Sequence, residues 1–182
     1  MNCIAIQTSP NETGLTASLA QAVLHGVKEN GGTTELLHLN HFNITSCIAC
    51  DNGWGQCREQ GTCILKDDFE ALRHKLVKAD ALVFATPVYF GGLSESATRF
   101  LDRLRRCERA TGFTTFRDKK AIGITSAGGS GRGAIRALYH LEDYLRRFGL
   151  EILDLVSVTR FSKVHKLPML QATGQQLASF KN

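Results

Sequence analysis

Four cysteines are crowded into a short stretch of this 182-residue chain, with a spacing that suits metal or redox chemistry. They stand as Cys47-x2-Cys50-x6-Cys57-x5-Cys63. Four thiolates are the usual ligand set of a [4Fe–4S] cluster, and they also suit tetrahedral zinc. In a reducing compartment such a group indicates metal or redox chemistry before disulfides. Three interpretations stay open: an iron–sulfur cluster, zinc, or thiols that are free, redox-active or structural.

Aromatic side chains and glycines directly follow a short apolar run at residues 81–85. The segment continues as Thr86, Pro87, Val88, Tyr89, Phe90 and Gly91. A continuous apolar run is typical of a strand covered on both faces, and Pro87 lacks the N–H needed to continue it. We therefore expect aromatic rings at a strand's carboxyl end, where a flat aromatic ligand can stack. The alternative is that Tyr89 and Phe90 only cover the core.

A second loop has the character of a phosphate site. Its candidate residues are Ser9, Asn11, Thr13, Gly14, Leu15 and Thr16. Hydroxyl groups and the unpaired N–H groups of a helix N-terminus together bind phosphate. The loop has no lysine or arginine and matches neither nucleotide-binding glycine pattern, which favours a monophosphate held by neutral donors. An ordinary strand-to-helix turn is the alternative.

A third loop, residues 126–133, is rich in glycine. Its candidate ligand contacts are Ser126, Ala127, Gly128 and Gly129. Glycine lets the backbone approach a ligand closely, because no Cβ intervenes. The alternative is a flexible connection.

The elements that position these loops alternate between strand and helix. Strands are expected near residues 3–6, 35–39, 81–85, 121–125 and 151–156, and helices near 15–28, 67–77, 94–108 and 134–148. Alternation predicts a parallel sheet with helices on both faces. Five strands suit the flavodoxin-like α/β order 2-1-3-4-5, in which all three loops share the carboxyl edge. Asp67 and Glu70 have the spacing of a capping box for the second helix.

The chain reads as one domain over residues 1–182, with a cysteine-rich insertion at about 41–66 and a short tail from about 159. Its composition is 43% hydrophobic and 21% charged, which is ordinary for a globular protein. No apolar run is long enough to span a membrane, and the N-terminus lacks the features of a signal peptide. We expect a cytoplasmic protein with no membrane partner.

The net charge is +5, and the arginines form two clusters. Residues 103–109 hold four of them, and Arg146-Arg147 follow in a later helix. A solvated helix face is the simpler interpretation, and a patch that steers an anionic cosubstrate is the other. No nucleic-acid motif accompanies them, so nucleic acid is not an expected partner.

The other residues whose side chains could take part in chemistry are interpreted as structural. Cys3 and Cys107 fall on a strand and a helix, where buried apolar cysteines are common. His38 and His41 show no metal-ligand spacing. Trp54 could shield a bound flavin or a partner surface, or pack within its loop.

The loop sequences resemble the NAD(P)H-dependent FMN reductase family of flavodoxin-like flavoproteins, close to its iron–sulfur flavoprotein branch. The resemblance covers about residues 2–157. Residues 9–16 resemble the family's phosphate loop, 86–91 with Phe100-Leu101-Asp102-Arg103 resemble its isoalloxazine loop and next helix, and 126–129 fall at its third flavin contact. Leu15 and Gln7-Thr8 depart from the common residues, and six residues separate Cys50 from Cys57 where the iron–sulfur branch has two.

This resemblance implies noncovalent FMN, hydride transfer from NADH or NADPH to the flavin, and electron delivery to a quinone, a flavin or a protein. It also implies a homodimer or higher homo-oligomer and assigns no acid–base side chain. The alternative is an FMN electron-transfer protein, with or without an iron–sulfur cluster, that has no NAD(P)H activity of its own. A phospho-receiver needs an acidic pocket after the first strand, and Gln7-Thr8-Ser9 supplies none.

Overall fold

Every strand of the sheet runs parallel to its neighbours, in the order β2-β1-β3-β4-β5. The computed structural model describes residues 1–180. The strands are β1 (Asn2–Gln7), β2 (Thr33–His38), β3 (Ala81–Pro87), β4 (Lys120–Ala127) and β5 (Glu151–Thr159). This order confirms the expected flavodoxin-like α/β fold.

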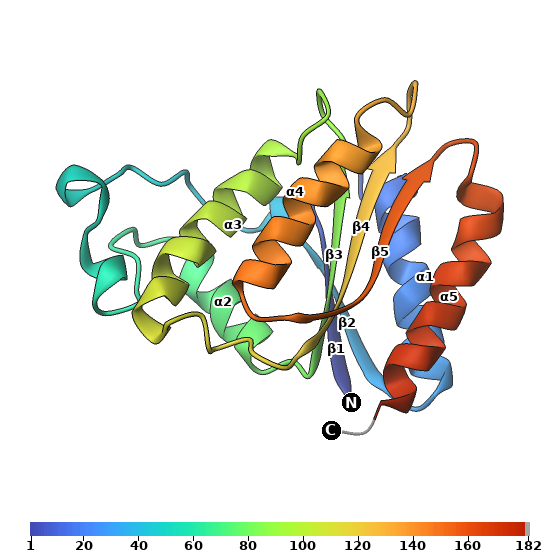
Figure 1. The fold of residues 1–182 in the computed structure, drawn as a ribbon, viewed down its shortest axis with the longest axis horizontal. Coiled ribbons are helices and arrows are strands. Elements are labelled where there is room, and N and C mark those ends of the chain that lie inside the picture. Colours follow the sequence, from blue (N-terminus) through green and yellow to red (C-terminus); the bar gives the residue numbers. More distant parts are fainter. Residues whose placement is uncertain (181–182) are drawn as a thin grey trace.

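Helices cover both faces of the sheet (Figure 1). Two of them, α1 and α5, lie on one face, and α2, α3 and α4 lie on the other. Their bounds are α1 (Leu15–Glu29), α2 (Phe69–Val77), α3 (Glu95–Glu108), α4 (Ala134–Arg147) and α5 (Lys163–Ser179). Within the described residues, none of the helices combines the length and the apolar character needed to cross a bilayer.

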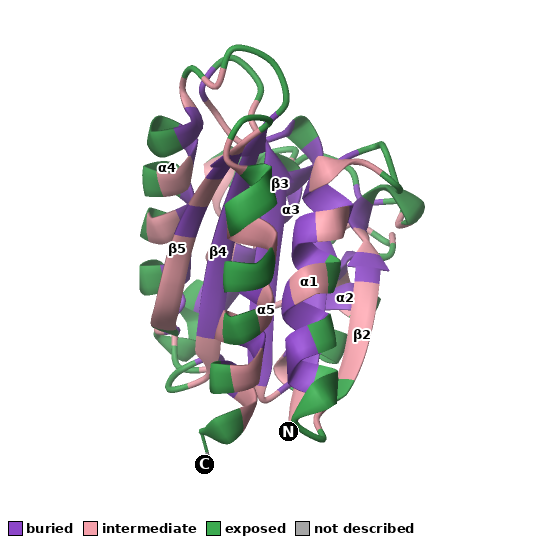
Figure 2. Cartoon of the chain, turned by 90° about the vertical axis from the view of Figure 1, so that its right-hand side faces the viewer, coloured by how far each residue is buried: buried purple, intermediate pink, exposed green. Residues whose placement is uncertain are grey.

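Burial follows the position of each strand in the sheet (Figure 2). Every residue of β3 is buried, and only the first residue of β4 is not. The edge strands β2 and β5 are mostly half-buried. Strands covered on both faces need apolar residues at successive positions, which explains why β3 reads as an unbroken apolar run.

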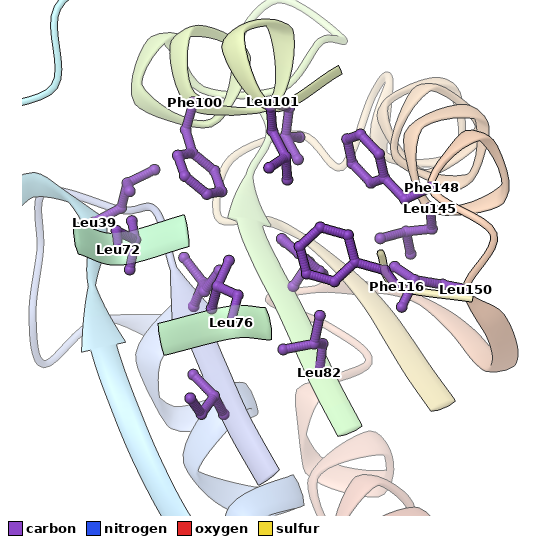
Figure 3. Close-up of a cluster of buried hydrophobic side chains, with 14 of the residues drawn as sticks. Leu39, Leu72, Leu76, Leu82, Phe100, Leu101, Phe116, Leu145, Phe148 and Leu150 are labelled. Atoms are coloured by element: carbon purple, nitrogen blue, oxygen red, sulfur yellow. The ribbon is translucent and has the colours of Figure 1, made fainter. Parts of the chain in front are cut away.

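The core between the sheet and helices α2, α3 and α4 fixes the helices that follow the second and third loops (Figure 3). Phe100 and Leu101 of α3 and Leu145 of α4 point into it. The rings of Phe116 and Phe148 lie 6.1 Å apart and tilted, a favourable arrangement for aromatic side chains. Because α3 and α4 begin directly after those loops, their packing holds the loops in place.

The expectation of a short tail after residue 159 is wrong. Strand β5 runs to Thr159, and the 17-residue helix α5 follows and packs against α1. The two helices approach closely because glycines meet there: a Cβ on Gly26 would lie 1.9 Å from the Gln171 carbonyl oxygen, and one on Gly174 would lie 2.1 Å from that of Val23. Pro168 lies inside α5, where its missing N–H removes one intrahelical hydrogen bond without ending the helix.

The expected capping box at the start of α2 is also wrong. Asp68 is the N-cap, and its side chain makes no capping hydrogen bond. The Asp67 carboxylate accepts the Phe69 N–H at 3.2 Å but also binds Arg103, while Glu70 accepts the Cys63 N–H at 2.9 Å. The two carboxylates therefore fasten neighbouring segments to α2 instead of capping each other's backbone.

Candidate functional site

The three loops singled out in the sequence meet at the carboxyl edge of the sheet, where the loops after β3 and β4 rise side by side (Figure 1). Direct hydrogen bonds join them. Thr16 Oγ1 and Ser126 Oγ, from the first and third loops, lie 2.7 Å apart and are buried. Thr8 Oγ1 lies 2.8 Å from Ser94 Oγ at the start of α3. The loops therefore form one connected surface.

The first loop is shaped by Gln7, a fully buried residue. The Gln7 Nε2 donates to the Ser9 carbonyl at 2.9 Å, and the Ser9 N–H donates to Gln7 Oε1 at 2.7 Å. Asn11 N–H then donates to Ser9 Oγ at 3.1 Å, and Thr13 N–H to Asn11 Oδ1 at 3.1 Å. The sequence pattern gave no sign of this role for Gln7, whose amide holds the loop backbone.

Helix α1 begins at Leu15, and its N-cap is Gly14. Glycine has no side chain, and no side-chain capping hydrogen bond is present at this helix start within residues 1–180. The first N–H groups of a helix have no partner within it, so an uncapped N-terminus is a receptor for an anion. The phosphate site stays a prediction that this helix start suits, although the Thr16 hydroxyl is engaged with Ser126.

Histidines close the outer side of this loop. His41 Nε2 lies 2.6 Å from the Glu12 carboxylate, and this contact lowers the pKa of Glu12. His38 Nδ1 accepts from Gln7 Nε2 at 2.8 Å, and the two imidazole rings stack at 5.2 Å. Both histidines thus contact residues of the candidate phosphate loop or of the strand before it, and their structural role stays a prediction.

The second loop is a tight turn with an aromatic residue at its tip. Tyr89 and Gly92 exchange two backbone hydrogen bonds, of 3.1 and 2.9 Å. Between them Phe90 and Gly91 have positive φ angles of 51° and 77°. The left-handed conformation is costly for an aromatic residue, and the Phe90 ring is fully exposed. This loop does not bury its rings in the core: Tyr89 is 39% exposed as well.

A cavity of about 380 Å³ lies between the second and third loops. Its lining includes Val88, Phe90, Gly91, Ala127, the loop 128–133 and Arg136. The loops approach so closely that a Cβ on Gly133 would lie 2.4 Å from the Gly91 Cα. In contrast, a Cβ on Gly128 or Gly129 would meet nothing within 4 Å, so the mouth of the cavity is open.

Two arginines at this cavity were missed in the sequence. Arg132 lies within the glycine loop, and Arg136 lies in the first turn of α4. Each lines the cavity, and neither has an ion-pair partner in the described residues. Their position directly after a glycine-rich loop was the available signal. They give the cavity a positive wall that suits an anionic ligand.

The cysteine-rich segment lies away from these loops, against the far end of α3 (Figure 1). Residues 42–68 contain only two short 3-10 helices, Asp51–Gly53 and Gln56–Arg58. The ends of the segment meet: Asn43 N–H donates to Asp68 Oδ2 at 2.7 Å, and Asp68 N–H donates to the Asn43 carbonyl at 3.1 Å. The insertion is thus a closed loop fastened to α3.

All four cysteines of the motif line one small cavity. Its other walls are Ile48, Ile64, Leu65, Arg103, Arg106 and Cys107. The backbone is folded tightly around the sulfurs: Ala49 N–H donates to Cys47 Sγ at 3.4 Å, and a Cβ on Gly55 would lie 2.6 Å from Cys50 Sγ. The predicted burial of Cys3 and Cys107 is confirmed, and burial raises the pKa of each thiol to about 12.

The described residues contain no group of three His, Cys, Asp or Glu side chains in position to hold one metal ion. The cavity nevertheless brings four thiols of the usual cluster ligand set together with a buried arginine whose Nε is unpartnered. Sulfur donors and a free N–H beside them fit a thiolate-bound cluster in chemical type.

The simpler interpretation of the first arginine cluster, a solvated helix face, is wrong for Arg103. Its side chain is 1% exposed and forms a two-pronged ion pair with Asp67, at 2.6 and 3.0 Å. Arg106 and Arg109 instead stack on Trp54, at 5.0 and 5.4 Å from the ring centre to the guanidinium carbon. Trp54 therefore packs its loop onto α3.

The sheet order and the three-loop carboxyl edge define a doubly wound α/β protein of the flavodoxin-like class. Within that class, the chain belongs to the NADPH-dependent FMN reductase family, whose model matches residues 1–163. The resemblance seen in the sequence is thus confirmed. The roles of the individual loop residues stay predictions.

Curated relatives carry the name iron–sulfur flavoprotein. One from Methanocaldococcus jannaschii is 34% identical over 105 residues, covering 58% of this chain and 52% of that protein. One from Methanosarcina thermophila is 25% identical over 156 residues, covering 84% and 77%. Three such relatives are matched over only about half their own length, 52%, 49% and 46%.

The solved structure of an NAD(P)H:quinone oxidoreductase from Methanothermobacter marburgensis is similar in fold. Its TM-score is 0.70, and the alignment covers 100% of this chain and 99% of that one. Sequence identity is 21%, so the likeness shows the shared fold alone.

Proposed function

We propose that this protein binds FMN noncovalently across the three loops of the carboxyl edge. The phosphate would lie at the first loop, on residues Ser9, Asn11, Thr13, Gly14, Leu15 and Thr16. The ring would lie between the second and third loops, on Thr86, Pro87, Val88, Tyr89, Phe90, Gly91, Ser126, Ala127, Gly128 and Gly129. Hydrogen bonds between these loops support a single ligand that spans them.

One observation carries this proposal: the Phe90 ring is fully exposed at the mouth of the glycine-lined cavity, in a left-handed conformation. A strained backbone raises the free energy of the folded state, and an exposed aromatic ring gains no burial free energy that would offset this cost. Such strain is concentrated at ligand sites. A flat aromatic ring system that stacks on Phe90 or Tyr89 would account for it.

The proposed reaction is hydride transfer from NADPH or NADH, with electrons then passed to a quinone, a flavin or a protein. When bound, the flavin supplies the hydride and electron chemistry. The protein's residues would hold the ring edge with backbone groups and exclude water with Tyr89 and Phe90. Arg132 and Arg136 would attract the anionic cosubstrate to the same cavity. No side chain is assigned as an acid or a base.

FMN titration followed by kinetics tests this function. FMN fluorescence should be quenched by the purified chain at a one-to-one ratio, and the complex should oxidise NADPH or NADH steadily with a soluble quinone. Phe180→Ala is the control, because the Phe180 ring lies 5.1 Å from Lys120 Nζ at the opposite edge of the sheet. This variant should bind FMN as the native chain does. Absence of quenching by folded protein in excess FMN would contradict the proposal.

A second candidate function is supported by the cysteine cavity: electron transfer through FMN and a [4Fe–4S] cluster, without NAD(P)H activity of its own. Cys47, Cys50, Cys57 and Cys63 would hold the cluster, which when bound would supply one-electron chemistry. Anaerobic purification with iron and sulfide assays tests it. About four irons per chain, with reduction only by ferredoxin-like donors, would favour this candidate. Zinc, or thiols with no iron, would remove it.

We also infer that the protein works as a homodimer or higher homo-oligomer in the cytoplasm. Ile135 and Tyr139, four residues apart on α4, are exposed apolar side chains. Such neighbouring side chains are typical of an interface. All six cysteines are free thiols, as in a reducing compartment. Sedimentation of the flavin-loaded protein gives the oligomeric state, and a monomer at micromolar concentration would exclude the dimer.

A further inference from the structure

One hydrogen-bond donor of Arg103, its Nε–H, has no partner among the described residues. Its Nη1 donates to Asp67 Oδ2 at 2.6 Å and to the Thr45 carbonyl at 3.1 Å, and its Nη2 donates to Asp67 Oδ1 at 3.0 Å. The guanidinium also lies over the Phe69 ring, 4.3 Å from its centre. Its Nε alone, among buried side-chain nitrogen and oxygen atoms of the described residues, has no partner. A buried donor left unpaired costs about 1–3 kcal/mol, so its retention needs an explanation.

The surroundings of this donor are sulfur. Arg103 lines the cavity formed by the four motif cysteines. A guanidinium is always charged in proteins, so a positive charge lies at the wall of this cavity. Arg106 and Cys107, three and four residues further along α3, line the same cavity, so one face of this helix forms its wall.

We propose that Arg103 is a positioning residue for a thiolate-bound iron–sulfur cluster, and that its Nε–H donates to the sulfur of Cys63. This inference rests on the cluster named in the second candidate function. Asp67 fixes the guanidinium plane, so that the remaining N–H is held toward the cysteine cavity. Arg106 adds a second positive charge against the negative charge of the thiolates.

The expected consequences follow from hydrogen bonding to sulfur. An N–H donated to a ligand sulfur stabilises the more negative, reduced cluster, and therefore raises its reduction potential. Partners of this kind also orient metal ligands, and their removal costs about 10- to 100-fold in metal affinity. Loss of the Arg103 Nε–H should lower the potential and speed the loss of iron.

Arg103→Lys tests the inference in the full chain, purified anaerobically and loaded with FMN, iron and sulfide. Lysine keeps the charge beside Asp67 but has no Nε–H. The matched control is Arg105→Lys on the same helix, because Arg105 is partly exposed and pairs with Asp102 at 2.8 Å. Two quantities are measured: the cluster's potential by spectroscopic redox titration, and the rate of iron release to a chelator.

The inference predicts a more negative potential and about tenfold faster iron release in Arg103→Lys, with native values in Arg105→Lys. Native values in a folded Arg103→Lys variant would overturn it. So would a native chain that binds FMN and no iron, and that result would leave the FMN reductase proposal intact. Should Arg103→Lys not fold, Asp67→Asn replaces it, since loosening the guanidinium should shift the potential in the same direction. An unchanged potential there would overturn the inference.

Discussion

Thr16 Oγ1 and Ser126 Oγ lie 2.7 Å apart, although 110 residues separate them along the chain. This buried hydrogen bond joins the first turn of α1 to the end of β4. The candidate phosphate site and the glycine-lined cavity are thereby held at a fixed distance. A ligand that spans both sites depends on that distance.

Thr16→Val keeps the shape of the side chain and removes this bond. We expect the free energy of unfolding to fall by about 1–3 kcal/mol, because the Ser126 hydroxyl is left buried without its partner. FMN affinity should fall as well. Urea unfolding of Thr16→Val, Ser126→Ala and the double variant measures the coupling. Strictly additive losses would show that the pair contributes nothing.

Phe90→Gly separates folding from ligand binding. Glycine adopts the positive φ without strain, so stability should stay equal or rise slightly, by about 1 kcal/mol at most. FMN binding should weaken by roughly 5- to 150-fold, because stacking on an aromatic ring contributes about 1–3 kcal/mol. Fluorescence titration and thermal unfolding give the two values. Tyr139→Ala, at an exposed aromatic on α4, is the control, and equal affinities in both variants would remove Phe90 from the site.

Asp67→Asn leaves the Arg103 charge buried without its counter-ion. Burial alone would raise the pKa of Asp67, but hydrogen bonds from Arg103, Thr45 and Phe69 outweigh it and hold the pKa well below its usual range. A carboxylate with a lowered pKa stabilises the fold above its unfolded value of about 4, and that contribution is lost as pH falls further.

The variant should therefore lose about 3–5 kcal/mol at pH near 7, and the difference from the native chain should shrink below about pH 4. Urea unfolding at several pH values measures it, with Asp118→Asn, a carboxyl outside any ion pair of the described residues, as the control. A difference that stays constant down to pH about 2 would contradict the role of the carboxylate.

Gly174→Ala probes the contact of α5 with α1. An added Cβ would lie 2.1 Å from the Val23 carbonyl oxygen, so the helices must separate. We expect a loss of about 1–3 kcal/mol, although alanine is the better helix former. Thr173→Ala, one position earlier, adds no atom at the contact and should change little. A more stable Gly174→Ala variant would contradict the close approach.

The frame of the molecule could be predicted from sequence because the features that define it are local. Apolar runs mark the buried strands, and Pro87 and the glycines mark their carboxyl ends. Features that depend on partners distant in sequence escaped prediction. Arg103 looked like part of a charged helix face, and only the fold shows Asp67 opposite it. Gly26 and Gly174 likewise gave no sign that their helices touch.

The candidate site divides in the same way. The three loops were predicted because each follows directly on a strand. The role of Gln7 was not predicted. It depends on the folded position of its side-chain amide, whose nitrogen and oxygen both hydrogen-bond to the Ser9 backbone. Arg132 and Arg136 were also missed, because a charge in or after a glycine loop has no fixed direction until the loop closes against Gly91.

The joined ends of the cysteine segment affect how sequences within this family can come to differ from one another. Asn43 and Asp68 bind each other's backbone at the two ends of the insertion, so the chain leaves and re-enters the frame at nearly one point. Lengthening a closed loop costs little, about 0.6 kcal/mol for each doubling. Changes in cysteine number and spacing can therefore accumulate within this segment while the sheet and the three loops at its carboxyl edge are inherited unchanged.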